Sequence, residues 1–228
     1  MKIIFKFFSL CFTFLILILN NSEFAYGIGN VDWLLLKENN DGKEWIDMGS
    51  IKAIIEPEIL MDGDHTIEKT AEVQEEVIKQ VYIACQANGV FLEGTLLKPS
   101  MTVNGAECQT KADPMKVAEM TIRTMERCVP ASVPGIVFLS GGLSEEAASV
   151  YLNNMNTLYR KALWNVSFSY GRALQHSCLK AWKGIETDAG QKALIARAQA
   201  NSEASKGSYV AGSQPSSDEQ LFVAGYTY

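Results

Sequence analysis

The 228-residue sequence is poor in histidine and has no paired cysteines. Its two histidines, His65 and His176, are too few for the clusters that metal-dependent hydrolases use. The five cysteines lie far apart without a CxxC pair, so their spacing predicts neither a zinc finger nor a disulfide framework. Asp62, Asp64 and His65 resemble a metal cluster locally, but their DGDH sequence is typical of a solvated turn. We therefore expect no metal and no other cofactor.

The sequence also lacks an excess of positive charge. Its formal net charge is -6 at pH 7, and the lysines and arginines are scattered rather than grouped. Because a nucleic-acid backbone needs a basic surface, we do not expect nucleic acid as a partner. With 47% hydrophobic residues, the chain can bury one well-packed domain.

A long uncharged apolar run occurs at the N-terminus. Lys2 and Lys6 precede this run, residues 7–19, and a small-x-small cleavage pattern follows it. Residues 1–27 therefore resemble a secretory signal peptide. The alternatives are a retained anchor, although the run is short for a membrane span, and a leader wrongly joined to the gene. Residues 28–52 match nothing that follows and are interpreted as a linker, and a membrane is an expected partner only if the leader is retained.

A short apolar strand, a polar turn and an amphipathic helix alternate four times from Ala53 onward. The expected strands are bounded by turn or polar residues and look buried on both faces: 53–55, 91–97, 135–139 and 165–168. The expected helices are 66–88, one capped by Asp113 with Pro114 first, one capped by Ser144, 172–182 and about 188–202. This alternation predicts an α/β fold with a parallel sheet.

Two architectures have such a sheet, a doubly wound fold and a (β/α)8 barrel. No GxGxxG follows the first strand, which argues against a dinucleotide-binding domain. The repeating units occupy residues 53–204. Residues 205–228 are rich in Ser, Gly and Gln and are interpreted as a flexible tail that ends in Tyr228.

Polar residues follow each expected strand, at the end where parallel α/β folds place their active sites. Glu56 and Glu58 flank Pro57, and the alternation of an extended chain puts both carboxylates on one side. Two neighbouring carboxyl groups can differ in protonation, which suits acid-base chemistry. A solvated turn with the same residues is the alternative.

Lys98 ends the second expected strand. Alternation along that strand would place its amine on the same face as Leu92, Gly94 and Leu96. A lysine along an apolar wall can attack a ketone carbonyl as the neutral amine and form an iminium ion, so Lys98 is a candidate nucleophile. An ordinary surface lysine is the alternative.

Two glycine-containing turns follow the last two strands. Ser140, Gly141 and Gly142 precede the helix capped by Ser144, where exposed backbone N–H groups can bind phosphate. Gly171 and Arg172 follow the fourth strand and add a backbone amide and a guanidinium, which can bind phosphate with two parallel bonds. A single glycine-rich turn is nonspecific, but (β/α)8 barrels often bind phosphate after their last strands.

These residues lie in stretches that resemble class I fructose-bisphosphate aldolases, in the family's order. The stretches are Ile55-Glu56-Pro57-Glu58-Ile59-Leu60, Leu92-Glu93-Gly94-Thr95-Leu96-Leu97-Lys98-Pro99, Phe138-Leu139-Ser140-Gly141-Gly142 and Phe168-Ser169-Tyr170-Gly171-Arg172-Ala173-Leu174. The resemblance runs from about Ile54 to Tyr228. The sequences at 98–101 and 225–228 look most like plastid-type members. The resemblance implies a (β/α)8 TIM barrel, of which the chain would hold about the last four units.

The resemblance also implies roles for single residues. Lys98 would be the Schiff-base lysine, Glu56 the acid-base group that dehydrates the carbinolamine, and Glu58 a carboxylate that holds the lysine and nearby cations. The terminal Tyr228 would close over the site and help move a proton at the enamine stage. The substrate phosphate next to the ketone would be bound by the two glycine-containing turns, at Ser140, Gly141, Gly142, Gly171 and Arg172.

For the whole molecule, the resemblance implies glycolytic or carbon-fixing cleavage of fructose 1,6-bisphosphate, a homotetramer and a plastid or cytoplasmic location. The leader would instead direct secretion or serve as the first part of a two-part targeting signal. The family's upstream residues, including the acid that assists carbon-carbon cleavage, have no counterpart before Ala53. The alternative is therefore a weak or inactive fragment that acts as a phosphate-binding or subunit-interaction module.

Overall fold

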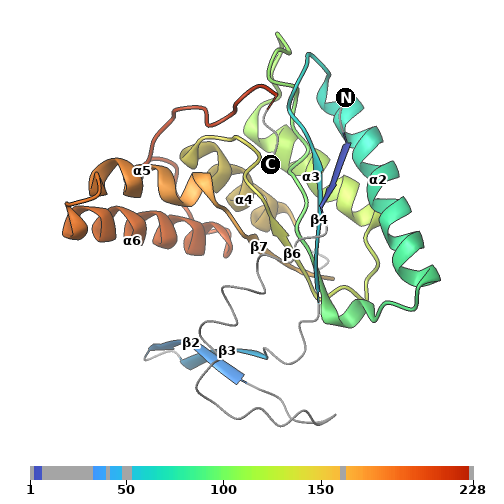
Figure 1. Ribbon diagram of the computed structural model, residues 1–228, viewed down its shortest axis with the longest axis horizontal. Coiled ribbons are helices and arrows are strands. Elements are labelled where there is room, and N and C mark those ends of the chain that lie inside the picture. Colours follow the sequence, from blue (N-terminus) through green and yellow to red (C-terminus); the bar gives the residue numbers. More distant parts are fainter. Residues whose placement is uncertain (1–2, 7–32, 40–41, 48–52, 160–162, 226–228) are drawn as a thin grey trace.

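The computed structural model describes residues 3–6, 33–39, 42–47, 53–159 and 163–225. The main sheet has the order β1-β4-β5-β6-β7 (Figure 1). Its strands are β1 (Ile3–Lys6), β4 (Ala53–Ile59), β5 (Thr95–Leu97), β6 (Gly135–Phe138) and β7 (Asn165–Phe168). Strands β4 to β7 pair in parallel and in chain order, whereas β1 pairs with β4 antiparallel.

Five helices connect or follow the parallel strands. They are α2 (Ile67–Ala87), α3 (Pro114–Cys128), α4 (Glu145–Leu158), α5 (Arg172–Trp182) and α6 (Thr187–Ala204). The predicted N-caps are confirmed: the Asp113 carboxylate accepts from two backbone N–H groups of α3, and the Ser144 hydroxyl accepts from Ala147 N at 3.1 Å. These bonds satisfy donors that a helix start leaves unpaired, which fixes where α3 and α4 begin.

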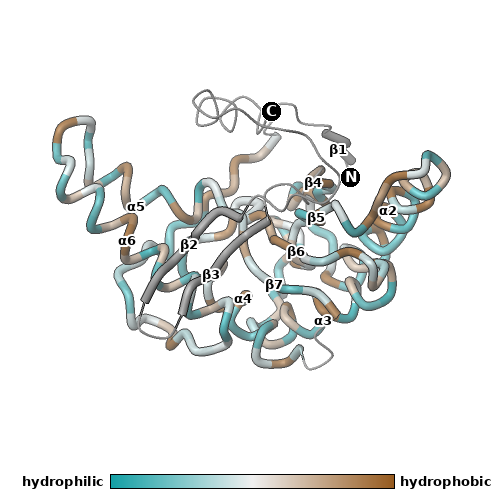
Figure 2. Tube along the Cα trace, turned by 90° about the horizontal axis from the view of Figure 1, so that it is seen from below, coloured by the Kyte–Doolittle hydropathy of each residue, from teal (hydrophilic) through white to brown (hydrophobic). Residues whose placement is uncertain are grey.

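The helices form a continuous layer, in which α2 packs against α3, α3 against α4, and α4 against α5 and α6. In Figure 2 the strands β4 to β7 succeed one another between α2 and the α5–α6 pair. The core lies between the sheet and this layer and includes the fully buried Leu97, Phe138, Met125 and Leu152. Burying side chains of this size stabilises the fold by about 1.5–3 kcal/mol each. The helix-covered parallel sheet confirms the predicted α/β class.

Three of the predicted strands have different bounds in the structure, although β6 ends only one residue earlier than predicted, at Phe138. The stretch 91–97 is not one strand: Leu92–Gly94 is a 3-10 helix, closed by bonds from Gly94 N to Phe91 O at 3.1 Å and from Thr95 Oγ1 to Leu92 O at 2.8 Å. Strand β4 is longer than predicted because Glu56, Pro57 and Glu58 pair with β1 and stay extended.

Strands β2 (Trp33–Asn39) and β3 (Gly42–Asp47) form a separate antiparallel pair inside the segment interpreted as a linker. The apolar run at 7–19 and the proposed cleavage pattern lie outside the described residues, so the signal peptide stays a prediction. Within the part of the chain that the structure describes, no helix is both long and apolar enough to span a membrane.

Candidate active site

The ends of the four parallel strands are held in line by backbone hydrogen bonds. Three of these bonds continue the pairing beyond the ends of β5, β6 and β7: Lys98 N to Ile55 O (2.7 Å), Leu139 N to Pro99 O (3.0 Å) and Ser169 N to Phe138 O (2.8 Å). Because neighbouring segments of the chain stay in register past the strand ends, the residues that follow the strands gather along one edge of the sheet, where the carboxyl ends of the strands lie. The predicted site residues from the four units therefore share this edge.

Lys98 and Glu56 form an ion pair across neighbouring strands, with 3.0 Å between Lys98 Nζ and Glu56 Oε1. Both side chains are partly buried. A carboxylate at this distance can accept a proton from the amine, or return one to a group bound to the lysine. The carboxylate that pairs with Lys98 is thus the one for which the family resemblance implies the acid-base role.

The side-chain alternation explains why these two groups meet. Leu97 is fully buried in the core below the helices, so its neighbour Lys98 points from the opposite face of the sheet. On β4, Pro57 and Ile59 are buried whereas Glu56 and Glu58 are partly exposed. The predicted grouping with Leu92 and Gly94 was wrong, because those two residues lie in the 3-10 helix, where side chains do not alternate.

The first glycine-containing turn follows β6. Leu143 N donates to Ser140 O at 2.9 Å, and Gly141 and Gly142 both have positive φ, +53° and +91°. A Cβ on Gly141 would lie 3.6 Å from Glu58 Oε1, which places that carboxylate beside the turn. The structure therefore brings Glu56 to the lysine and Glu58 to the predicted phosphate-binding turn.

The second turn contributes Gly171, the N-cap of α5, and Arg172, its first residue. Arg172 Nη1 donates to Leu221 O at 2.7 Å, and Leu221 N donates to Gly142 O at 2.9 Å. One residue near the C-terminus thus joins the two turns that were predicted to bind phosphate.

The contacts between α4 and the C-terminal segment were missed by sequence reasoning. Residues 208–225, called the strap below, lie along the first turn of α4 and continue past β6. The Glu146 carboxylate accepts from Tyr209 Oη at 2.9 Å, Gly212 N at 2.9 Å and Ser216 Oγ at 2.7 Å. Burial opposes its ionisation, but these hydrogen bonds outweigh burial and hold the pKa of Glu146 below its usual value.

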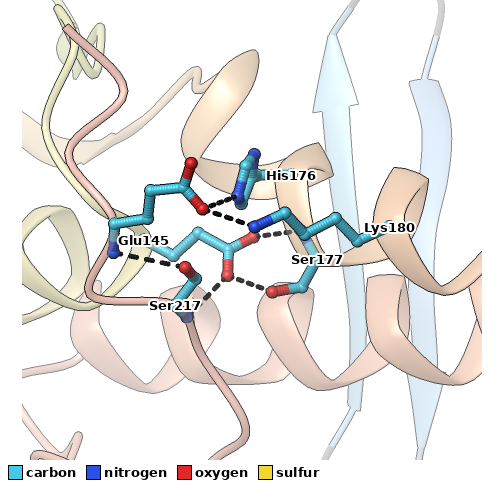
Figure 3. A network of polar contacts seen from close by, with 6 residues as sticks. Glu145, His176, Ser177, Lys180 and Ser217 are labelled. Carbon is cyan, nitrogen blue, oxygen red and sulfur yellow. Dashed lines mark hydrogen bonds and ion pairs between the residues drawn. The ribbon is translucent and has the colours of Figure 1, made fainter.

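Glu145 is fully buried and binds both α5 and the strap (Figure 3). Its carboxylate accepts from Ser177 N at 2.9 Å and from Ser217 N at 3.0 Å. Farther along the strap, Glu219 pairs with His176 and Lys180 of α5. In the sequence, Glu145 and Glu146 directly follow the Ser144 cap, where carboxylates suit a helix start, and nothing local indicates these contacts. Two successive acids after a cap, taken together with a distant Ser-rich tail, were the available signals for these contacts.

Asp62 and His65 do not form a metal site with neighbouring acids. Across the described ranges, no group of three or more His, Cys, Asp or Glu side chains is placed to hold a metal ion. Asp62 Oδ1 instead accepts from Gly225 N at 2.7 Å, and burial lowers the pKa of His65. The position of Tyr228, the remaining predicted site residue, falls outside the described residues.

Comparison with known proteins agrees with this geometry. The family model for class-I fructose-bisphosphate aldolase matches residues 47–228. The chain is 51% identical over 179 residues to cytosolic fructose-bisphosphate aldolase 4 of Arabidopsis thaliana, covering 77% of this chain and 46% of the relative. It is 51% identical over 178 residues to chloroplastic aldolase 3 of the same plant, covering 77% and 45%.

A solved structure is similar as well. It is fructose-bisphosphate aldolase from Plasmodium falciparum in complex with TRAP and a small molecule inhibitor, with a TM-score of 0.68 and 50% identity over 70% of this chain and 46% of that chain. The chain spans about half the length of the curated relatives it matches. The family model, the relatives and the shared parallel sheet agree, and the chain belongs to the class I fructose-bisphosphate aldolase family.

Proposed function

We propose that the chain carries the Schiff-base chemistry of a fructose-bisphosphate aldolase, with Lys98 as the nucleophile. The observation that carries this proposal is the 3.0 Å contact between Lys98 Nζ and Glu56 Oε1 on neighbouring parallel strands. It joins an amine and a carboxylate at the sheet edge where parallel α/β folds place their chemistry. The proposed reaction, supported by the match to the aldolase family, is the reversible aldol cleavage of fructose 1,6-bisphosphate to dihydroxyacetone phosphate and glyceraldehyde 3-phosphate.

In the proposed reaction, the neutral Lys98 amine adds to the ketone carbon and forms a carbinolamine. Glu56 donates a proton to the departing hydroxyl, water leaves, and the iminium ion forms. As the carbon-carbon bond breaks, the C4 hydroxyl gives its proton to the Glu56 carboxylate that the dehydration left ionised, and the iminium accepts the electron pair. The aldehyde then leaves and an enamine remains. Tyr228 is proposed to help protonate this enamine, after which water releases the ketone product and the amine.

The phosphate next to the ketone is proposed to bind between the two glycine-containing turns. Arg172 supplies a guanidinium, and Ser140, Gly141, Gly142 and Gly171 supply hydroxyl and backbone N–H donors. Glu58 lies beside Gly141, where its charge would orient Lys98 and nearby cations. Leu221 O occupies one of the five N–H donors of Arg172, which leaves other donors of the guanidinium for a phosphate.

The test is borohydride reduction of the protein with dihydroxyacetone phosphate, followed by intact-mass analysis. We expect one adduct, lost in Lys98→Ala and kept in Lys192→Ala, which removes an exposed lysine of α6. A coupled assay with fructose 1,6-bisphosphate then measures turnover. An adduct without turnover would support a chain that forms the Schiff base but does not complete cleavage, whereas no adduct would refute the proposal.

The location and assembly of the protein are proposed from the family alone. Similar relatives are named cytosolic and chloroplastic, which supports a cytoplasmic or plastid location. A homotetramer that binds sugar phosphate is the corresponding proposal for assembly and partner. Sedimentation of the purified protein tests the tetramer, and a fluorescent fusion to residues 1–52 tests whether the leader directs secretion or plastid targeting.

A further inference from the structure

A buried polar network holds the segment of the chain that follows Lys98. Its side chains come from α2, from this segment and from α3, and each has at most 4% of its surface exposed: Gln74, Ser100, Thr102 and Thr121. A polar group at such depth costs free energy unless it is hydrogen-bonded. The partners in the network therefore restrict where the segment can lie.

Gln74 of α2 uses both ends of its side-chain amide in this network. Its Nε2 donates to Ser100 O at 2.6 Å, and its Oε1 accepts from Thr102 Oγ1 at 2.6 Å. One planar group thus binds two residues of the segment at once. Thr102 N in turn donates to Thr121 Oγ1 of α3 at 3.0 Å. Residues 100–102 are therefore fixed to two helices of the layer that covers the sheet.

Ser100 connects the network to β4. Its hydroxyl oxygen accepts from Ile59 N at 3.0 Å. Ser100 is two residues beyond Lys98, and Ile59 is three residues beyond Glu56. On the other side of this pair, Lys98 N donates to Ile55 O at 2.7 Å. The two backbones that carry the ion pair are thus joined both before and after it.

The distance between the Lys98 amine and the Glu56 carboxylate depends on these backbones. Both side chains are partly exposed, so water screens their attraction, and the ion pair by itself fixes their distance only weakly. Misplacing a reacting group by about 1 Å can lower a rate by about 100-fold. A buried group that holds the segment after Lys98 can therefore affect the chemistry without touching the substrate.

We propose that Gln74 is a positioning residue of the aldolase site, which keeps Lys98 beside Glu56 by holding Ser100 and Thr102. Its catalytic consequence rests on the proposed function. The placement of the segment does not, because it is a property of the fold.

Three substitutions separate this role from a general loss of packing. Gln74→Met keeps the length of the side chain and removes both hydrogen bonds. Thr102→Val removes only the hydroxyl that donates to Gln74, whereas Thr102→Ser keeps a hydroxyl. Thr70→Val is the matched control, because Thr70 lies one turn earlier on α2 and makes a similar buried bond, to Val103 O at 2.7 Å, farther from Lys98 along the chain.

Hydrogen exchange of the Ile59 and Lys98 amides reports the placement of the segment without any need for catalysis. We expect Gln74→Met to speed exchange at both amides by about tenfold, as for the loss of buried hydrogen bonds. The Ser169 amide, held by Phe138 O between the last two strands, should not change. Equal exchange of the Ile59 and Lys98 amides in the wild type and Gln74→Met would overturn the inference that Gln74 holds the segment.

The catalytic consequence is measured by the rate at which borohydride traps dihydroxyacetone phosphate on Lys98. In Gln74→Met, we expect the rate at saturating ligand to fall by about tenfold. The ligand concentration that gives half of the maximal rate should stay within about twofold, since the proposed phosphate-binding turns follow β6 and β7. Thr70→Val should trap at the wild-type rate. An unchanged rate in Gln74→Met, or an equal loss in Thr70→Val, would overturn the positioning role.

The Thr102 pair gives the same comparison with a milder change. We expect Thr102→Val to lower the trapping rate by about threefold and Thr102→Ser to retain it, because only the second keeps the donor to Gln74. This pair decides the question if Gln74→Met does not fold, and equal rates in the two variants would then overturn the role. If the wild type gives no adduct, the aldolase function fails, and hydrogen exchange alone decides whether Gln74 holds the segment.

Discussion

Lys98 and Glu56 form an ion pair between two neighbouring parallel strands, whereas the Glu58 carboxylate lies beside Gly141 in the turn after β6. Strand β4 presents both carboxylates on one face, and the register in which Ile55 pairs with Leu97 places Glu56 beside the end of β5. The carboxylate that faces the amine is therefore selected by strand register. Two acids that look equivalent in the sequence therefore have different neighbours in the structure.

Replacing Glu56 tests whether the carboxylate acts as an acid-base group. Glu56→Gln keeps the size of the side chain but cannot exchange a proton, so we expect the rate of adduct formation on Lys98 to fall by about 100-fold. The measurement is the time course of borohydride trapping by intact mass. The control is Glu93→Gln, at an exposed position before β5. Equal rates in wild type and Glu56→Gln would contradict the assigned role.

The attachment of the strap to Glu146 should depend on pH. Although burial opposes it, hydrogen bonds from Ser216, Gly212 and Tyr209 lower the pKa of Glu146 in the folded protein. A carboxyl with a lowered folded pKa contributes stability that is complete above its unfolded pKa and is lost as the pH falls through its folded pKa. We therefore expect the wild type to lose this contribution in acid.

The measurement for Glu146 is the urea midpoint of wild type and Glu146→Gln between pH 7 and pH 3. The variant should unfold at lower urea than the wild type at pH 7, and the difference should shrink as the pH falls below the usual range of a glutamate. Glu119→Gln, an exposed site on α3, should follow the wild type throughout. A midpoint difference that is independent of pH would argue against ionised Glu146 as the anchor.

Gly142 should not tolerate a side chain, because the strap crosses directly over it. A Cβ there would lie 2.8 Å from Phe222 Cα, and its φ is +91°. We expect Gly142→Ala to destabilise the protein by about 1–2 kcal/mol from the backbone conformation and by about 1–3 kcal/mol more from the contact. Gly89→Ala should show only the destabilisation from the backbone conformation, since Gly89 has φ +66° and a Cβ there would have nothing within 4 Å. Equal losses in urea denaturation would contradict the contact.

Arg197 should be a large contributor to the stability of α6 on α4. It is fully buried, and its Nη2 donates to Glu145 O at 2.9 Å and to the Ser149 hydroxyl. Arg197→Met fills similar space but leaves these acceptors without their donor, so we expect a loss of about 3 kcal/mol. The exposed Arg123→Met should change stability by less than about 0.5 kcal/mol. Urea denaturation of both variants measures the difference.

The sequence by itself determined the local structure and the family. Capping residues predict α3 and α4 because Asp113 and Ser144 act on N–H groups two or three residues away. Alternating strands and helices predict the parallel sheet, and the motifs around Lys98 identify the aldolase family before any coordinates. The 3-10 helix at Leu92–Gly94 was missed because a short apolar run does not distinguish a strand from a tight turn.

The tertiary structure alone decided which distant groups meet. Glu145 and Glu146 look like ordinary acids at a helix start, and Asp62 looks like part of a solvated turn, yet all three bind the strap. Gly142 looks like a phosphate-binding glycine but also makes room for Phe222. Local patterns report neighbours within one helical turn or strand, whereas these contacts arise only after the strands align and the C-terminal segment crosses them.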